Sequence, residues 1–184
     1  MIRDYYNRNA LDEKLRGAPR PPGANHLAIG YRQAVAMVLA VAGEGDSVER
    51  LLSSATEFAV RFSAPGEWLV VSENDTPEGL QRRLDALCSG QAHIVDQSEA
   101  RVLFRLSGPS TRRILAKGIG LDLHPKAFAT GASANALCGH IAVNLARTGE
   151  DAFELIAPRS FAESLFDDLM TMGREYDLAA AFAA

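Results

Sequence analysis

The stretch from Ala34 to Gln97 decides the fold; it reads AVAMVLAVAGEGDSVERLLSSATEFAVRFSAPGEWLVVSENDTPEGLQRRLDALCSGQAHIVDQ. Apolar residues first recur at every second position and then at helical spacing, and this change of period happens twice. The order is strand, helix, two strands, helix and a last short strand. It is the order of a split β-α-β unit, a ferredoxin-like antiparallel sheet with both helices on one face.

Cap and turn residues bound these elements. The expected elements are a strand from 34, a helix over 46–55, strands at 58–62 and 68–72, a helix after residue 76, and a strand at 93–96. Asp46 is predicted to cap the first helix, with Glu49 three residues on. Thr76 before Pro77 is a start signal of a different kind, a cap followed by a proline at the first helical position. Trp68 is expected in the core.

Residues 98–176 repeat the plan in element order, although not residue by residue. Their pattern predicts a strand to Ser107, a helix from Gly108-Pro109-Ser110, a loop over 120–131, strands near 136–147 and 152–157, and a helix that a capping box at 160–163 begins. We therefore predict an α+β protein of two tandem ferredoxin-like modules with antiparallel sheets. The halves 34–97 and 98–176 are expected to form one compact unit, or two halves that share an interface, because no proline-rich or polar linker separates them.

Both ends of the chain are expected to be irregular. Residues 17–23 read GAPRPPG, and prolines and glycines at this density oppose a helix or a central strand. Residues 1–33 are therefore predicted to be an irregular arm, either mobile or docked on a partner. Residues 177–184 are predicted to be a frayed tail.

Composition excludes several classes of function. The formal net charge is −4 and the pI is about 5.6, so no basic field is available for nucleic acid or anionic lipid. The most apolar run, 35–42, is too short to cross a bilayer. The N-terminus has no apolar core of a secretory signal, and the two cysteines form no C-x-x-C pair. We expect a cytoplasmic location, no nucleic-acid partner and no membrane partner.

Candidate ligand sites are weak. Neither a dinucleotide nor a P-loop glycine pattern occurs. The turn 107–110 could present N–H groups to an anion, but a serine-capped turn is the favoured interpretation. The four histidines are scattered without metal-ligand spacing.

Candidate catalytic residues are equally weak. Asp122 and His124 could form a general-base pair, although a local loop hydrogen bond is favoured because no nucleophile accompanies them. Cys88 and Cys138 are expected to be buried. Arg159 is expected at a helix entry, and a carboxylate bound to it is the less favoured alternative. We therefore predict no catalytic, cofactor-binding or metal-ligating residue.

A family resemblance gives these segments another meaning. It rests on three characteristic pieces, Ala116-Lys117-Gly118, Leu121-Asp122-Leu123-His124-Pro125 and Arg159-Ser160-Phe161-Ala162. Supporting pieces are VDQS from 95, FRLSGP from 104, Phe128, Gly131, RTG from 147, FEL from 153 and GEWLV from 66. In this combination and order, the chain resembles the gamma subunit of heterotetrameric sarcosine oxidases.

The resemblance implies a subunit of a flavoenzyme that demethylates sarcosine to glycine and a one-carbon unit. FAD, FMN, NAD and tetrahydrofolate would bind only in partner subunits, and the partners would be the alpha, beta and delta subunits. The gamma subunit would have a folate-binding fold related to the glycine-cleavage T-protein, without chemistry of its own. The alternatives are a small folate-binding one-carbon transfer protein, the gamma chain of a related N-methyl amino-acid dehydrogenase such as N-methylglutamate dehydrogenase, and a free regulatory module.

Overall fold

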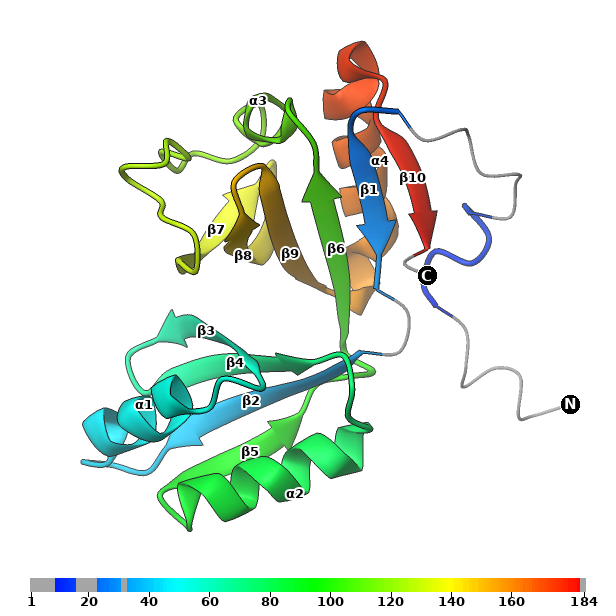
Figure 1. Ribbon diagram of the computed structural model, residues 1–184. Helices are drawn as coiled ribbons and strands as arrows, with labels where there is room; N and C mark the ends of the chain where they lie inside the picture. Colours follow the sequence, from blue (N-terminus) through cyan, green and yellow to red (C-terminus); the bar gives the residue numbers. More distant parts are fainter. Residues whose placement is uncertain (1–8, 16–22, 31–32, 183–184) are drawn as a thin grey trace, which may run out of the picture. The chain divides into compact units, whose positions relative to one another are not determined.

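The chain forms two compact units, each built on one β-sheet (Figure 1). The computed structural model describes residues 9–15, 23–30 and 33–182. Unit 1 contains the described residues up to 30 together with 102–132 and those from 136, and unit 2 contains residues 33–101 together with 133–135. The expected α+β class is confirmed, and the two predicted halves correspond to two compact units. The predicted border after residue 97 lies four residues before the observed one.

Unit 2 is the split β-α-β module that the opening stretch predicts. Its elements are β2 (Ala34–Ala40), α1 (Gly45–Ser54), β3 (Ala59–Ala64), β4 (Glu67–Ser72), α2 (Pro77–Cys88) and β5 (Ala92–Asp96). The strand order β3-β4-β2-β5 places the first and last strands of the module side by side, and the pairings are antiparallel. Each predicted element of this half is confirmed within a few residues.

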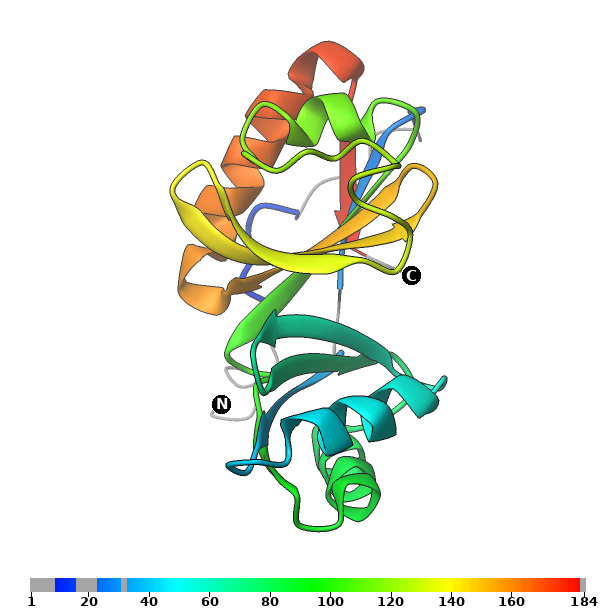
Figure 2. The same ribbon diagram turned by 90° about the vertical axis from the view of Figure 1, so that its left-hand side faces the viewer.

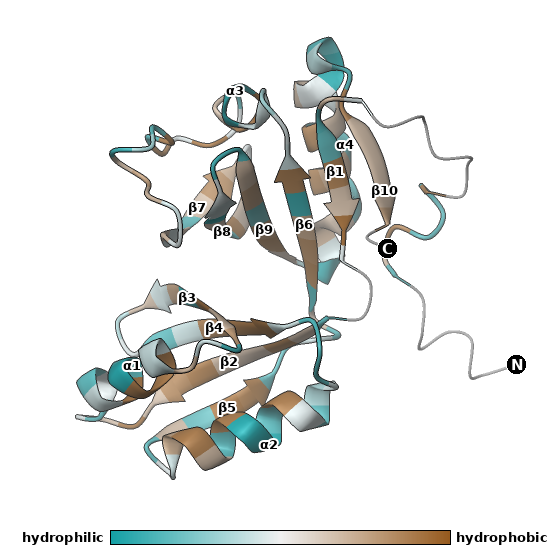
Figure 3. Ribbon diagram, in the orientation of Figure 1, coloured by the Kyte–Doolittle hydropathy of each residue, from teal (hydrophilic) through white to brown (hydrophobic). Residues whose placement is uncertain are grey.

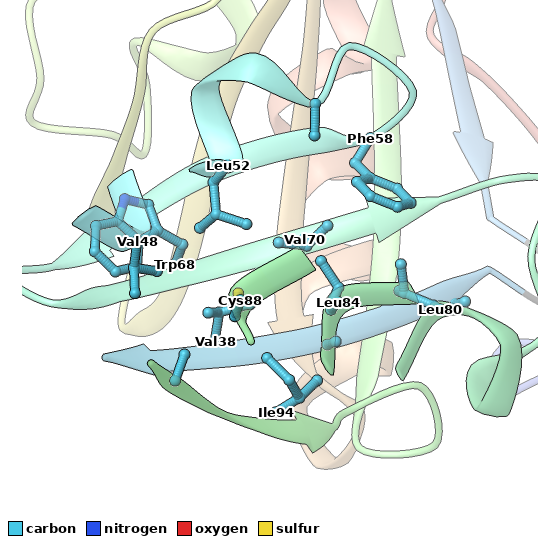
Figure 4. Close-up of a cluster of buried hydrophobic side chains, with 14 residues drawn as sticks. Val38, Val48, Leu52, Phe58, Trp68, Val70, Leu80, Leu84, Cys88 and Ile94 are labelled. Atoms are coloured by element: carbon cyan, nitrogen blue, oxygen red, sulfur yellow. The ribbon is translucent and has the colours of Figure 1, made fainter. Parts of the chain in front are cut away.

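The core of unit 2 lies between its sheet and its two helices (Figure 4). Alternate residues of β2 and β4 supply one side, and the apolar stripes of α1 and α2 supply the other, which Figure 3 shows as brown bands on otherwise teal helices. The large side chains of this cluster are Val38, Val48, Leu52, Phe58, Trp68, Val70, Leu80, Leu84 and Ile94. The prediction that Trp68 belongs to the core is confirmed, since 5% of it is exposed.

Of the two helix caps predicted for unit 2, one is confirmed and the other is wrong. Thr76 caps α2 as expected, because its Oγ1 accepts the N–H of Gly79 at 3.1 Å and Pro77 opens the helix. The prediction for Asp46 is wrong. α1 begins one residue earlier, at Gly45, and Asp46 lies within its first turn, where a carboxylate still suits the helix dipole.

Unit 1 has a second split β-α-β module around a larger sheet. Its elements are β1 (His26–Ile29), β6 (Arg101–Ser107), α3 (Thr111–Leu115), β7 (Ser133–Cys138), β8 (Ile141–Gly149), β9 (Ala152–Pro158), the 3-10 turn η2 (Arg159–Phe161), α4 (Ala162–Gly173), the 3-10 turn η3 (Arg174–Tyr176) and β10 (Ala179–Phe182). The strand order is β10-β1-β6-β9-β8-β7. The sheet thus extends the module's four strands by β1 and β7, although Arg101 of β6 and residues 133–135 of β7 group with unit 2.

Strand β1 corrects the prediction of an irregular arm over residues 1–33. It lies between β6 and β10, antiparallel to the first and parallel to the second. In unit 2 the corresponding first and last strands are direct neighbours. Leu27 and Ile29 alternate with half-buried residues and are almost fully buried. The proline-rich part of the arm, residues 17–22, lies outside the described residues.

Two further predictions for the second half are corrected. The single strand expected near residues 136–147 is a hairpin, because Gly139 has φ +58 and breaks the run between β7 and β8. The expected frayed tail contains β10, which completes one edge of the sheet. None of the helices in the described parts of the chain is long and apolar enough to span a bilayer.

Candidate functional site

The turn after β6 was the candidate for anion binding, and its N–H groups are already occupied. Gly108 donates to Asp151 O at 3.0 Å, and Thr111 donates to Gly108 O at 3.1 Å. Ser110 donates to the side-chain Oδ1 of Asn25 at 2.9 Å. All three N–H groups of this turn are therefore paired within the chain, and the acceptor for Ser110 is a side chain from the N-terminal segment.

Asn25 joins three parts of unit 1. Besides accepting from Ser110, its Nδ2 donates to Tyr176 O at 2.9 Å and its carbonyl accepts the N–H of Ala179 at 3.1 Å. Only 4% of this residue is exposed. The approach is so close that a Cβ on Gly108 would lie 2.3 Å from Ala24 O. Glycine is therefore required here, both for space and for its φ of +124.

Both serine caps predicted for this half are wrong. Ser110 precedes α3 but makes no side-chain cap bond. The box at residues 160–163 does not form either, because η2 covers Arg159–Phe161 and α4 begins only at Ala162. The sequence pattern marks the entry to a helix correctly, but a tight 3-10 turn takes the place of the cap.

Asp122 and His124 lie in the loop that connects α3 to β7, residues 116–132. The Asp122 Oδ1 accepts the N–H of His124 at 2.9 Å, and His124 Nδ1 accepts the N–H of Lys126 at 3.2 Å. Both polar atoms therefore shape a local turn. The local hydrogen bond predicted for this loop is confirmed.

Arg147 is a buried residue that hydrogen-bonds both to this loop and to the β8–β9 hairpin. Only 5% of it is exposed, and its guanidinium donates to Phe128 O at 3.0 Å, Gly149 O at 3.0 Å and Glu150 O at 2.9 Å. Its backbone N–H also donates to Ala132 O at 3.0 Å. A planar fork with five donors suits such a set of carbonyls, and lysine could not replace it. The arginine of the RTG motif thus connects the loop to the β8–β9 hairpin.

Two neighbouring cations secure α3. Arg112 donates to Glu150 O at 3.0 Å and lies 3.1 Å from the carboxylate of Asp151. Lys117 donates to Met172 O at 2.6 Å and also pairs with the carboxylate of Glu175. The hydrogen bond from Lys117 to Glu175 lowers the pKa of that carboxyl group. The A-K-G motif therefore joins the end of α3 to the end of α4.

The cysteines are packing residues, as predicted. Cys88 and Cys138 are free and fully buried. Burial, with a smaller contribution from Asp168, raises the pKa of the Cys138 thiol to about 11, and burial also raises the pKa of Cys88. A thiol with so high a pKa is a poor nucleophile at neutral pH.

Residues 96–98 form a turn that side-chain hydrogen bonds hold in place, as in the turn at Asp122 and His124. The Asp96 Oδ1 accepts from the N–H and the hydroxyl of Ser98, at 2.9 and 2.6 Å. The Ser98 Oγ also accepts the N–H of Val35 at 3.0 Å. These bonds attach the end of β5 to the start of β2.

Unit 1 also has an open pocket beside α4. It is lined by Asp167, Met170, Thr171, Arg174, Asp177 and Leu178. Asp167 is already paired with Lys14. Within the described residues, no group of three His, Cys, Asp or Glu side chains is placed to hold a metal ion.

Comparisons with known proteins identify the family. The family model described as "Sarcosine oxidase, gamma subunit family" matches residues 17–172. The chain belongs to this family. Sarcosine oxidase subunit gamma of Corynebacterium sp. (strain U-96) is 29% identical over 165 residues, which cover 90% of this chain and 76% of that relative. The subunit gamma of Arthrobacter sp. is 32% identical over 144 residues, covering 77% and 65%.

Solved structures agree on the fold of this gamma-subunit family. A chain of the heterotetrameric sarcosine oxidase from Corynebacterium sp. U-96 superposes with a TM-score of 0.76 at 24% identity, covering 96% of this chain and 98% of that one. The glycine cleavage system aminomethyltransferase T from Bartonella henselae gives a TM-score of 0.61 at 16% identity, covering 88% and 48%. The predicted likeness to the T-protein fold is confirmed.

Proposed function

We propose that this chain is the gamma subunit of a heterotetrameric sarcosine oxidase, and that it stabilises or positions the large subunits without reacting itself. One observation carries the assignment: the gamma-subunit family model matches the chain from residue 17 to residue 172. The partners in this proposal are the alpha, beta and delta subunits. Together they oxidise sarcosine to glycine and a one-carbon unit.

The non-catalytic role is supported by what the polar groups do. Four polar side chains hydrogen-bond to backbone atoms of their own unit, namely those of Asn25, Asp122, His124 and Arg147. Such bonds hold loops and strands in place, whereas a catalytic group must point a reactive atom at substrate. In this proposal FAD, FMN, NAD and tetrahydrofolate bind to the partner subunits. We place the assembly in the cytoplasm.

The test is co-expression with the three partner subunits, one of which carries an affinity tag. The gamma chain is expected to co-purify in stoichiometric amount, and the assembly is expected to consume oxygen when sarcosine is added. The chain purified alone is expected to carry no flavin and to leave sarcosine unchanged. Absence from the purified assembly would contradict the subunit assignment, and turnover by the isolated chain would contradict the non-catalytic role.

A folate-binding role for this chain is tested separately by calorimetric titration of the isolated chain with tetrahydrofolate. The proposal expects no heat of binding at high micromolar ligand. Saturable heat would instead support the one-carbon transfer alternative.

A further inference from the structure

The pocket beside α4 is a part of unit 1 that the proposed function leaves unexplained. Its volume is about 540 Å³, and it is lined by residues of α4, of η3 and of the turn before β10. Figure 2 shows this part of the chain as α4, in orange, which turns at η3 and returns as β10, in red. Leu178 is buried and Met170 is half-buried, whereas Arg174 and Asp177 are exposed. The pocket therefore combines an apolar wall with two opposite charges at its opening.

The described chain before residue 16 ends beside this pocket. The ammonium of Lys14 pairs with the carboxylate of Asp167, which lines the pocket. Leu11, three residues earlier, is fully buried. Residues 9–15 are therefore attached to unit 1, and the chain leaves them next to α4.

The chain is described again from Gly23, which lies beside the same pocket. A Cβ on Gly23 would lie 2.9 Å from the carbonyl oxygen of Asp177, and Asp177 lines the pocket. Two residues further on, the Asn25 side chain donates to Tyr176 O at 2.9 Å. Residues 16–22 therefore begin and end at one pocket.

The separation of these two ends limits where residues 16–22 can lie. From Asp167 to Asp177, α4 and η3 rise on the order of 15 Å, at about 1.5–2 Å per residue. The peptide steps from residue 15 to residue 23 span roughly 25 Å in an extended proline-rich chain, at about 3.1 Å per residue. The segment is thus long enough to follow the pocket. Its middle can move only on the order of 10 Å from the line between its ends.

The composition of residues 16–22 suits an apolar recess. The segment reads RGAPRPP, with three prolines and no acidic residue. Prolines bring apolar rings and lose little chain entropy on docking, because their φ is already fixed. The match to the family model begins at residue 17, so most of the segment belongs to the region that this model covers.

We propose that residues 16–22 of this chain occupy the pocket beside α4, and that this docking stabilises β1 between β6 and β10. A segment attached at both ends meets its pocket at an effective concentration of about millimolar, so weak contacts are enough and a separate molecule is at a disadvantage. β1 begins at His26, shortly after the segment, so a docked segment restrains the strand that completes the sheet. The inference assigns a pocket and a segment that the proposed function does not use, and it does not depend on that function.

The experiment is hydrogen exchange of the β1 amides, residues 26–29, in the full chain. Pro21→Gly together with Pro22→Gly changes the segment, and Thr171→Arg places a large cation in the pocket. Ser164→Arg is the matched control, because Ser164 is exposed on the same helix but does not line the pocket. We expect the segment variant and Thr171→Arg each to speed exchange several-fold, and Ser164→Arg to leave it unchanged.

Combining the segment change with Thr171→Arg shows whether segment and pocket act on each other. When the segment no longer docks, Thr171→Arg has nothing further to displace, so the combined variant should exchange no faster than the faster single variant. Effects that multiply in the combined variant overturn the docking, as does a segment variant that exchanges like the unaltered chain. If that variant instead lowers recovery of the gamma chain from a tagged assembly, the segment binds a partner and the proposal is equally overturned.

Discussion

The two units follow one plan, but only unit 2 follows it along a continuous stretch of chain. In unit 2 the first and last strands of the module, β2 and β5, pair directly. In unit 1 the corresponding strands, β6 and β10, are separated by β1, which comes from the other end of the chain. The same order of elements therefore gives a self-contained sheet in one case and a sheet that needs a distant segment in the other.

The two units also differ in what joins their parts. Unit 2 is held by a contiguous apolar cluster between helices and sheet. Unit 1 adds buried polar links, namely Asn25 between three segments and Arg147 between a loop and a hairpin. Apolar packing is non-directional, so several neighbouring apolar side chains can provide it. A hydrogen-bonded link instead needs one particular partner at the right distance and angle. We therefore expect unit 1 to be the more sensitive of the two to changes in the N-terminal segment.

The largest expected effect comes from deleting residues 1–30. This removes β1 and with it two rows of strand pairing, so β6 and β10 are left apart. We expect unit 1 to lose its ordered sheet while unit 2 keeps its core. Trp68 is the one tryptophan in the sequence and lies in that core, so its fluorescence reports unit 2, and hydrogen exchange over 136–182 reports unit 1. Exchange as slow as in the full chain would contradict the role of β1.

The next effect concerns the apolar core of unit 2. Leu84 is fully buried on α2, and Leu84→Ala should lower the free energy of unfolding by about 2–5 kcal/mol through lost burial and a cavity. Urea unfolding followed by Trp68 fluorescence measures it. Leu87→Ala, on the same helix but at a partly buried position, should cost clearly less. Equal losses would show that burial in this cluster is not what stabilises the unit.

A glycine pair sharpens the comparison between the units. Gly108→Ala should cost at least about 2 kcal/mol, because the new Cβ adds a clash with Ala24 O to the strain of a positive φ. Gly43 in unit 2 also has a positive φ, +88, but no described atom lies within 4 Å of the point where an alanine would place its methyl group. Gly43→Ala should therefore cost only the strain, about 1 kcal/mol. Thermal unfolding of both variants measures these losses of stability. Similar losses for the two variants would contradict the close approach of the N-terminal segment to Gly108.

Two predicted caps allow a smaller test. Thr76→Ala removes a cap bond that forms and should cost about 1 kcal/mol. Ser160→Ala removes a cap that the sequence pattern predicts but that does not form, and its effect should stay within about 0.5 kcal/mol. Chemical denaturation at neutral pH measures both. A larger loss for Ser160→Ala than for Thr76→Ala would contradict the observed helix starts.

The smallest effect is a change in the pH dependence of unit 2. The hydrogen bond from Ser72 lowers the pKa of Asp75, burial opposes this, and Arg83 lowers it further. Because the folded pKa is depressed, the stability from Asp75 is present above its ordinary value of about 4 and is lost as the pH falls through the folded pKa. Asp75→Asn should therefore flatten the loss of stability below about pH 4. An unchanged acid slope in urea titrations would contradict this.

Local signals made much of the candidate site predictable. Cys88, Cys138, Asp122 and His124 have the structural roles that their neighbours in sequence suggested. The roles of Asn25 and Arg147 could not be predicted, because their partners lie far away in sequence or depend on how a loop returns to the sheet. Hydrophobic periodicity carries no information about such polar links.

The sequence by itself determined the α+β class, all six elements of unit 2, the Thr76 cap and the family, because period, caps and motifs are local properties of the chain. Only the tertiary structure decided that β1 enters between β6 and β10, that the tail forms a strand, and that buried polar side chains hold the turn after β6 and the loop before β7. The physical reason is that short edge and insertion strands have little propensity of their own. They become strands because a neighbouring strand offers unpaired N–H and C=O groups.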